Sequence, residues 1–550
     1  MSRLVLCACA ATALFWPLLA DSAFGAVEKL GVKLASRKKL AIGVAGIAPI
    51  LLRTCILKWF PVPVPAVHDE FSYLLAADTF AHGRLTNATH PMWIFFETFH
   101  VNMQPTYMSK YPPGQGAALA LGQLFGHPWI GVLLSVGVMC AAIVWALQGW
   151  FPARSAFLGG VLAAIQFGVF NYWSDSYWGG AVGAIGGALV AGALPRIFRH
   201  QRRRDSLILG IGAAILAVSR PWEGAVFCAT AAIAIAFWIF GRRGPSRPIK
   251  FSRVMAPAAL VLVATGAFLA YDNWRVTGDP LLFPYRLNDV TYMKAPHFAW
   301  QKLDAPREYR NAEFDNFYNE WVPAMWKDNH LDASWRGVKN GLLSKLEGLR
   351  EFYLPGEFSA VVLVALPWLW RDRKIRLLSL LAAACVVAVI AVVWFEPHYA
   401  APMTAAIFGI VIQAMRYLRR VRWRGRPVGI GLTRVVVIFA FALIPVQAWT
   451  SWHHPPDSDD EHLRYRAQFA SELRNAQGDQ LVIVRYSSDH DPGEEWVYNR
   501  ADIDHAKIVW AREIPGEDIR PLLDYFRDRR VWLAEPDAEP PRLSLYQRGQ

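Results

Sequence analysis

Two adjacent carboxylates, Asp69 and Glu70, follow the first apolar segment that is long enough to cross a membrane. Such a pair is most often a solvated turn or the cap of a helix. Here residues 71–80 follow with the pattern of an amphipathic helix, so the pair would lie at the positive N-terminal end of that helix. This position favours the ionised carboxylate, which is the form that a general base requires. Asp69 and Glu70 are therefore candidates for taking a proton from a substrate.

Two cations are placed where they could meet a phosphate. Lys110 stands just before paired prolines, where the chain is about to enter its next apolar segment. A lysine in this position usually extends its ammonium group to the membrane surface. Beside a carboxylate on the same side of the membrane, it could instead bind a lipid phosphate. Arg220 lies in a loop on the side of the membrane from which arginine is otherwise sparse. A cation in this position requires an anionic binding partner.

Two further outward loops carry polar side chains among aromatic ones. Asp175 is a single carboxylate in a short turn that contains Trp173 and Trp178. Acid and aromatic groups together suit a sugar ring, although tryptophans at a membrane surface explain the same pattern equally well. His398 and Tyr399 lie between two apolar segments. A lone histidine at a helix start is usually structural, but this one could bind a phosphate or a sugar hydroxyl.

The elements that must position these residues are apolar segments of about 20 residues, the length that crosses a bilayer as a helix. They predict a multi-span α-helical membrane protein with about 11 to 13 transmembrane helices. Gly179, Gly183 and Gly187 repeat every four residues, which indicates close helix packing and not a site. The predicted spans lie near 40–60, 114–126, 128–148, 156–172, 179–195, 206–220, 223–241, 254–271, 357–370, 377–394, 400–417 and 430–449.

The charged residues of the loops are sorted by side. Arginine and lysine gather at 196–204, 242–253, 371–376 and 416–426. By the positive-inside rule these loops are cytoplasmic. All of the candidate residues fall in the loops of the opposite side, which predicts a site on the extracytoplasmic face of the inner (plasma) membrane.

The composition is too apolar for an ordinary soluble enzyme. The chain has 550 residues, of which 54% are hydrophobic, and its mean hydropathy is positive. The formal net charge is +13, but the arginines lie beside apolar segments, where they set orientation and meet anionic headgroups. We therefore expect a lipid bilayer and no nucleic acid as a partner. The six cysteines all lie in or beside apolar segments, so no disulfide framework or zinc site is predicted.

The chain divides into three predicted parts. Residues 1–39 hold an apolar segment, interpreted as a signal peptide, an extra transmembrane helix or a misassigned start, followed by a basic cytoplasmic loop. Residues 40–451 form the membrane domain, with long outward loops at 61–113 and 272–356. The second of these loops is rich in aromatic and charged residues, which predicts interfacial helices that either cap the bundle or gate a substrate. Residues 452–550 form a soluble domain.

The C-terminal domain is predicted to be a small extracytoplasmic α/β unit. Residues 480–486, 506–510 and 530–534 have the composition of strands, and 516–529 have helical spacing. A proline-rich and acidic linker at 453–461 precedes them. The domain has no glycine-rich phosphate loop, which argues against nucleotide binding there.

Together these features resemble the multi-spanning GT-C glycosyltransferases that use polyprenyl-phosphate-linked sugars. This superfamily includes the protein O-mannosyltransferases of glycosyltransferase family 39 and the aminoarabinose transferases of lipid A. An acidic pair in the first outward loop, here Asp69 and Glu70, is the signature of that superfamily. The resemblance covers roughly residues 40–450, and the other matching features are Lys110 to Pro113 at the end of that loop, Asp175 as a second outward acid, and His398, Tyr399 and Pro402 before a late helix.

The resemblance implies a reaction and roles for these residues. An acceptor hydroxyl would attack the anomeric carbon of a sugar on a polyprenyl phosphate, with inversion and loss of the lipid phosphate. Asp69 would be the base, and either Glu70 or Asp175 would orient a substrate. No metal is required, because positioned cations can stabilise the leaving phosphate, although a carboxylate-bound Mg²⁺ or Mn²⁺ stays an open alternative. The cations and other groups assigned to the donor phosphate are Lys110, Arg220, His398 and Tyr399.

The acceptor and some other classes of protein stay open. The acceptor carries a hydroxyl group and could be a lipid, a polysaccharide or a protein, since the best-known members lack this C-terminal domain. A transporter is the main rival, but transporter sites usually lie near the bilayer midplane. A structural or assembly protein of the cell envelope is another rival, and so is a ligase or polymerase that uses a diphosphate-linked donor.

Overall fold

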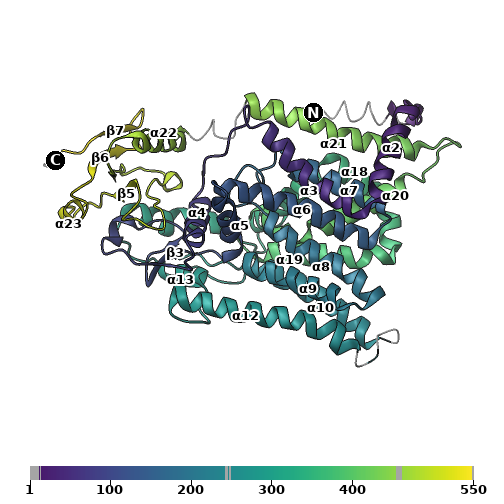
Figure 1. The fold of residues 1–550 in the computed structure, drawn as a ribbon, viewed down its shortest axis with the longest axis horizontal. Coiled ribbons are helices and arrows are strands. Elements are labelled where there is room, and N and C mark those ends of the chain that lie inside the picture. The colour runs from purple at the N-terminus through teal and green to yellow at the C-terminus, as the bar shows by residue number, and fades with distance from the viewer. Residues whose placement is uncertain (1–10, 13, 242–245, 247–248, 454–460, 548–550) are drawn as a thin grey trace.

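The structure is a computed structural model that describes residues 11, 12, 14–241, 246, 249–453 and 461–547. A bundle of long helices makes up most of the molecule, and a small α/β domain lies at one end of it (Figure 1). The predicted fold class is therefore confirmed. Residues 4–10 and 13 of the apolar segment near 4–20 lie outside the described residues, and so does most of the linker at 453–461.

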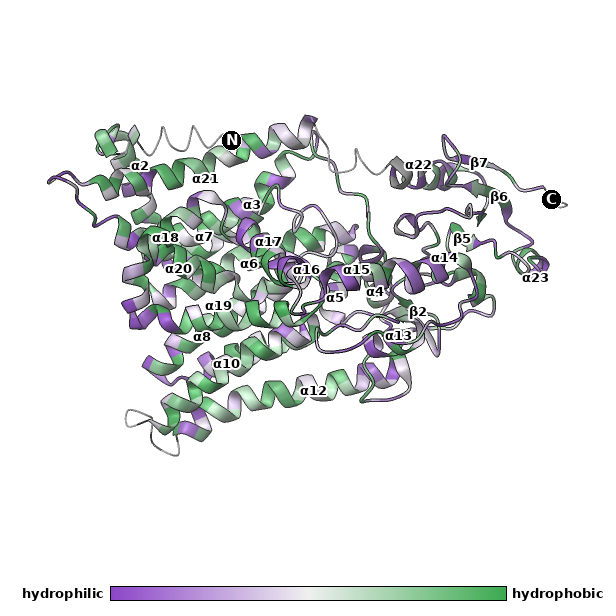
Figure 2. Cartoon of the chain, turned by 180° about the vertical axis from the view of Figure 1, so that it is seen from behind, coloured by the Kyte–Doolittle hydropathy of each residue, from purple (hydrophilic) through white to green (hydrophobic). Residues whose placement is uncertain are grey.

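Helices form at every apolar segment that the sequence predicts as a span. Figure 2 shows hydrophobic residues along the middle of these helices and hydrophilic ones gathered toward their ends. The helices of the bundle are α3 (Lys38–Cys55), α5 (Pro113–Leu124), α6 (Pro128–Trp150), α7 (Ala153–Phe167), α8 (Ala181–His200), α9 (Arg203–Ser219), α10 (Pro221–Phe240), η2 (Lys250–Met255) with α12 (Ala256–Thr277), α18 (Gly356–Arg371), α19 (Arg373–Ala391), η5 (Pro397–Met403) with α20 (Thr404–Leu418), and α21 (Val428–His453).

The number of full-length spans is lower than the expected 11 to 13. Among the described residues, seven helices are long and apolar enough to cross a membrane, or up to eight if the bent pair at 335–353 and 356–371 is one span. Others are too short, such as α5 with 12 residues and α7 with 15. Short helices of this kind can complete a bundle while packed against longer neighbours.

Glycines bring α8 close to the backbone of η5. A Cβ atom added at Gly187 would lie 1.9 Å from the carbonyl oxygen of Pro402. A larger side chain therefore cannot fit there, and the prediction that the glycine repeat is a packing face is confirmed. The contact fixes η5, which carries His398 and Tyr399.

Residues 21–36 form a helix, α2 (Asp21–Ser36), although the charge pattern predicts a loop there. Acidic side chains of α2 pair with arginines of the late helices: Asp21 with Arg434 at 2.8 Å, and Glu28 with Arg419 at 2.8 Å. The helix therefore lies at the arginine-rich end of the bundle. The pattern of basic residues in this segment cannot report ion pairs with arginines that lie so far along the chain.

At the other end of the bundle, the first outward loop folds around α4 (His68–Ala81). Ten of the fourteen residues of α4 are buried, so the helix is enclosed on nearly all sides and is not amphipathic in its surroundings. The rest of the loop contains η1 (Trp93–Phe96) and a small sheet of order β1-β3-β2 with strands β1 (Asn87–Ala88), β2 (Val101–Asn102) and β3 (Thr106–Ser109).

The second outward region is a set of short helices between the bundle and the C-terminal domain (Figure 2). Its aromatic side chains form a buried cluster that includes Phe99 of the first loop together with Phe314 and Phe317. The helices are α13 (Pro284–Tyr292), α14 (Ala312–Asp315), η3 (Asn316–Trp321), α15 (Val322–Asn329), α16 (Trp335–Val338), η4 (Lys339–Ser344) and α17 (Lys345–Tyr353).

The C-terminal domain has a four-stranded sheet of order β5-β4-β6-β7. Strand β4 (Gln480–Val484) pairs in parallel with β5 (Ile508–Arg512) and β6 (Arg530–Glu535), which confirms the three predicted strands. A fourth strand, β7 (Arg542–Leu545), pairs antiparallel with β6. Helices α22 (Glu461–Asn475) and α23 (Arg520–Tyr525) complete the domain.

This domain shares a hydrophobic core with the first outward loop. Leu75, Phe96 and Val101 of the loop pack in one buried cluster with residues of the domain such as Leu481 and Val509. Burial of apolar surface is the main stabilising term in folding. The domain is therefore packed as part of the outward face, which explains why α4 is enclosed.

Candidate active site

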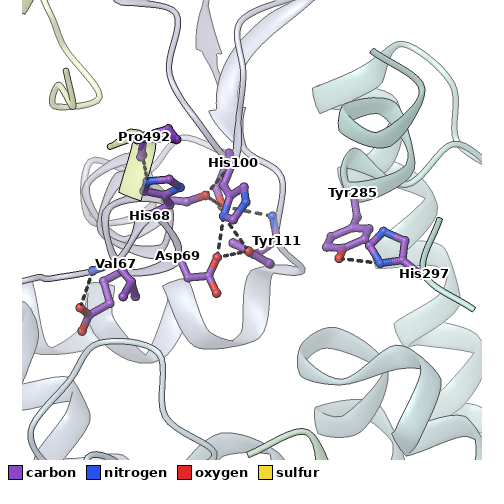
Figure 3. A network of polar contacts seen from close by, with 11 residues as sticks. Val67, His68, Asp69, His100, Tyr111, Tyr285, His297 and Pro492 are labelled. Atoms are coloured by element: carbon purple, nitrogen blue, oxygen red, sulfur yellow. Dashed lines mark hydrogen bonds and ion pairs between the residues drawn. The ribbon is translucent and has the colours of Figure 1, made fainter. Parts of the chain in front are cut away.

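Asp69 lies in the first turn of α4, where two donors meet one of its oxygens (Figure 3). The hydroxyl of Tyr111 donates to Oδ1 in a short hydrogen bond, and Nδ1 of His100 lies 2.6 Å from the same oxygen. Burial opposes ionisation of Asp69, but His100, Lys110 and Tyr111 outweigh it and hold the pKa of Asp69 well below its usual range. Asp69 is therefore a carboxylate at neutral pH.

His100 is held in an unusual backbone conformation. Its φ angle is 61°, in the left-handed region that residues other than glycine seldom adopt. Its carbonyl oxygen accepts hydrogen bonds from Oγ of Ser72 at 2.7 Å and from the backbone N–H of Lys110 at 3.2 Å. Such strain persists only where the surrounding contacts impose it. The loop around His100 is therefore built to place this imidazole on Asp69.

Lys110 is buried next to these groups. Its side chain is only 3% exposed, and its Nζ atom lies 5.0 Å from the ring centre of Tyr285 and 5.3 Å from that of Tyr111. Burial lowers the pKa of Lys110, while Asp69 and Asp289 on two sides of it oppose this effect. The ammonium group therefore provides positive charge near Asp69.

A cavity of about 620 Å³ lies beside this group and is bounded by both outward regions and by the ends of the bundle helices. Tyr111 is one of its lining residues, whereas Asp69, His100 and Lys110 are not among the described residues that line it. The volume is within the range of pockets that bind small organic molecules. The lining includes Tyr73, Tyr111, Arg220, Trp222, Glu223, Tyr285, Arg286, Asp289, Lys294, His297, Arg307, Trp394 and Tyr399.

Arg220 is the cation of this cavity that comes from the bundle. It stands where α9 ends and α10 begins, and its guanidinium group lies 4.8 Å from the ring centre of Tyr399. No carboxylate among the described residues lies within ion-pairing distance of it. Glu223 and Glu396 interact with Arg220 only over a longer distance. A half-buried arginine that forms no direct ion pair can bind an anion such as a phosphate, which its planar donors fit well.

His398 and Tyr399 are adjacent in η5 but have different surroundings. Tyr399 lines the cavity beside Arg220. His398 is 1% exposed, its Nδ1 atom lies 3.0 Å from the hydroxyl of Tyr172, and its ring packs edge-on against Trp178. Tyr399 therefore lies in the lining of the cavity, whereas His398 is buried and is not among the described residues that line it.

Glu70 points away from Asp69 and binds the backbone. Its Oε2 accepts hydrogen bonds from the N–H groups of Ala66 at 2.6 Å and Val67 at 3.2 Å, and its Oε1 accepts one from Tyr177 at 2.7 Å. Burial raises the pKa of Glu70 to about 7, although the three donors oppose this change. These contacts connect the start of α4 to the loop before α8.

Asp175 forms an ion pair with Arg53 of α3. Nη2 of Arg53 lies 2.8 Å from Oδ1 of Asp175, and Nε donates a hydrogen bond of 2.9 Å to the same oxygen. Nη1 and Nη2 donate to the carbonyl oxygens of Phe60 and Pro61. The arginine side chain is 2% exposed and its guanidinium group stacks on Trp129. Asp175 therefore lies apart from the cavity and fixes the outward end of α3.

Several residues of the site have no clear signal in the sequence. Tyr285, Asp289 and His297 line the cavity, and Nε2 of His297 lies 3.0 Å from Oδ2 of Asp289. Nδ1 of the same ring lies 3.4 Å from the hydroxyl of Tyr285 (Figure 3). They stand in a long loop with many other polar residues. Glu396 is a further candidate, because burial and, to a smaller extent, Asp69 raise its pKa to about 7 against the opposing effect of Arg220. Only its place beside His398 could have indicated it.

Comparisons with known proteins identify the fold. No family model matches the chain, and no curated protein matches its sequence. Among solved structures, the chain is similar to ArnT from Cupriavidus metallidurans bound to undecaprenyl phosphate, with a TM-score of 0.51 and 12% identity over 90% of this chain and 92% of that one. This protein therefore shares its fold with ArnT, as the resemblance of its sequence motifs predicts.

Two weaker likenesses were also found. ArnT of the same organism in the apo state has a TM-score of 0.46 and 12% identity, over 94% of this chain and 93% of that one. The Archaeoglobus fulgidus oligosaccharyltransferase, tethered with an acceptor peptide, has a TM-score of 0.43 and 11% identity, over 80% of this chain and 62% of that one.

Proposed function

We propose that the protein is a membrane glycosyltransferase that moves a sugar from a polyprenyl phosphate to an acceptor hydroxyl, with inversion at the anomeric carbon. The observation that carries this proposal is a single cavity that is lined on one side by a hydrogen-bond partner of Asp69 and on another side by a cation. On one wall Tyr111 is hydrogen bonded to the ionised Asp69. On another wall Arg220 forms no direct ion pair with a carboxylate of the described residues, and Glu223 and Glu396 interact with it over a longer distance. A base and a cation are the two groups that this transfer needs.

In the proposed reaction Asp69 takes the proton of the acceptor hydroxyl. The acceptor oxygen forms a bond to the anomeric carbon, while the bond from that carbon to the phosphate oxygen breaks and leaves its electron pair on the phosphate. Arg220 binds this phosphate, and Tyr399 holds the guanidinium group in place through its ring. Lys110 adds positive charge close to Asp69. No step requires a metal ion, because these cations supply the positive charge.

The other predicted residues have supporting roles in this proposal. His398 packs behind Tyr399, Glu70 fixes the start of α4, and Asp175 fixes α3 through Arg53. The donor lipid is proposed to enter from the bilayer, on the extracytoplasmic side of the inner membrane. The structure of ArnT with undecaprenyl phosphate, a protein of the same fold, supports a lipid phosphate as the donor.

The test is turnover with purified protein in detergent. Wild type and Asp69→Asn are incubated with a panel of polyprenyl-phosphate sugars, and release of the lipid phosphate and transfer of labelled sugar are measured. Asp328→Asn is the matched control, because Asp328 lies on the exposed surface of α15 with a side chain that is 61% exposed. Turnover that is lost only in Asp69→Asn supports the proposal. Equal behaviour of wild type and Asp69→Asn on all donors would remove Asp69 as the base, and a transporter or assembly role would then fit better.

A further inference from the structure

The first turn of α4 is covered by a segment of the C-terminal domain. Residues 492–501 of the domain run along the helix and contact it at both ends. At the far end the carboxylate of Asp78 lies 2.7 Å from Nη2 of Arg500 and accepts a hydrogen bond of 2.9 Å from the N–H of Ala501. The whole helix that carries Asp69 is therefore attached to this domain.

At the near end, the domain contacts the two residues on either side of the Asp69–Glu70 pair. Nε2 of His68 lies 2.8 Å from the carbonyl oxygen of Pro492, so this nitrogen carries the proton and donates it (Figure 3). The ring of Phe71 stacks on the ring of Tyr498, with centres 4.2 Å apart and an angle of 1° between the planes. The rotation of the first turn about the helix axis is therefore fixed from outside.

The same histidine also reaches the partner of Asp69. The ring of His68 stacks on Phe99 with centres 4.6 Å apart and an angle of 9° between the planes. Phe99 precedes His100, whose Nδ1 atom lies 2.6 Å from Asp69. The contact with Pro492 thus fixes the position of His68, which precedes Asp69. Through the stacked rings it also fixes Phe99, which precedes His100. Burial lowers the pKa of His68 to about 4, so the ring stays neutral and keeps the single donor that Pro492 requires.

The contacting segment is itself held rigidly. Glu495 forms a buried ion pair with Arg512 of β5, and Nη1 of Arg512 lies 3.0 Å from Oε2 of Glu313 in the second outward region. The side chains of Glu495 and Arg512 are both fully buried. Removing one partner of a buried pair is strongly destabilising, so this arrangement resists movement.

We propose that the C-terminal domain is a working part of the active site, in which Tyr498 and His68 are positioning residues that hold Asp69 and His100 in register. The inference rests on the proposed function for its activity readout and on the contacts themselves for its structural one. A base must be held within a few tenths of an ångström to act efficiently. The domain supplies this constraint at the one helix turn that carries the acid.

The experiment compares three variants with the wild type. Tyr498→Ala removes the stacked ring, and Tyr498→Phe keeps it. Tyr465→Ala alters a partly buried tyrosine of α22 that packs on Phe469 and has no ring contact with α4 among the described residues. Tyr498→Ala should lower kcat at least about tenfold with little change in the KM for the donor, since a displacement of about 1 Å can cost about a hundredfold in rate. Tyr498→Phe should retain the activity, and so should Tyr465→Ala once its folding is confirmed.

A second measurement does not depend on turnover. Hydrogen exchange of the backbone in residues 68–81 should become faster in Tyr498→Ala and stay as in wild type in Tyr498→Phe. If Tyr498→Ala is folded and leaves both kcat and exchange unchanged, the positioning role is wrong. If wild type shows no turnover that depends on Asp69 while exchange responds as expected, the proposed function fails and the attachment of α4 to the domain stands.

Discussion

The hydroxyl of Tyr111 and the carboxylate of Asp69 are hydrogen bonded although 42 residues separate them in the chain. The same oxygen of Asp69 lies 2.6 Å from His100, so two donors from the end of the loop hold one oxygen. Both of these contacts are made by Oδ1, and under the proposed function the other carboxylate oxygen takes the proton of the acceptor. The paired donors also keep Asp69 ionised, which is the state a base needs.

Replacement of Tyr111 by phenylalanine should shift the pH dependence of the reaction. The variant loses one donor to the carboxylate, and a hydrogen bond to a charged group contributes about 1.5 to 3 kcal/mol. The pKa of Asp69 then rises toward its usual range, so the acidic limb of the pH profile of kcat moves to higher pH. Tyr73→Phe is the control, because its ring stacks on Tyr111 at 4.5 Å and lines the same cavity. An unshifted acidic limb in Tyr111→Phe would contradict the assignment.

Replacement of Arg220 by glutamine should lower kcat by about a hundredfold, which is the usual effect of losing one group that stabilises developing charge. Arg220→Lys should have an intermediate rate, since a lysine keeps the charge and loses the planar pair of donors. Steady-state release of the lipid phosphate measures both. Arg275→Gln, at the exposed end of α12, should behave as wild type. Equal rates for all three variants would exclude Arg220 from the donor site.

Replacement of Asp175 by asparagine should lower stability more than turnover. The change leaves the buried Arg53 without its carboxylate, at a cost of about 2 kcal/mol, below the 3 to 5 kcal/mol of a fully buried pair because the side chain of Asp175 is 26% exposed. Thermal unfolding in detergent measures the loss. In the double variant with Arg53→Met the loss should be smaller than the sum of the single ones. A large fall in kcat without a change in unfolding temperature would instead make Asp175 a substrate-binding residue.

Replacement of Glu70 by glutamine should change how stability depends on pH. Burial raises the pKa of Glu70 from 4.5 to about 7, so the folded state favours the protonated acid. Its contribution is fully present below pH 4.5 and is lost as the pH rises to about 7, which amounts to roughly 3 kcal/mol. The unfolding temperature of the wild type should therefore fall relative to that of Glu70→Gln as the pH rises from 4.5 to about 7. Above about pH 7 the difference should stay constant. Other groups that titrate here, such as Glu396, are present in both proteins and cancel. A difference that does not vary with pH would contradict the shift.

The helical bundle and three strands of the C-terminal sheet could be predicted from the sequence, because their signals are local. Apolar length defines a span, and runs such as Leu481 to Val484 define a buried strand. The surroundings of α4 could not be predicted in this way. Its polar residues, among them Asp78, are covered by a domain more than 400 positions away, and no local pattern reports such a contact.

The candidate site was partly predictable for the same reason. Asp69, Lys110, Arg220 and Tyr399 stand at the ends of apolar segments, where a charge or a polar ring attracts notice. His100 and His297 stand within long loops, and only the folded chain brings them to the cavity or to Asp69. Arg53 lies inside a predicted span, and its charge could have indicated an ion pair with an outward acid.

The hydrogen bond between His68 and Pro492 joins residues that are 424 positions apart. A ribosome that adds about 5 to 20 residues per second needs roughly 20 to 85 s to make the chain between them. During that time the early helices can already be inserted in the bilayer while α4 still lacks its cover. A nascent chain that stops before the last sixty residues would therefore carry all of the described bundle helices while the candidate site lacks the cover of α4. The order of the sequence thus separates membrane insertion in time from completion of the candidate site.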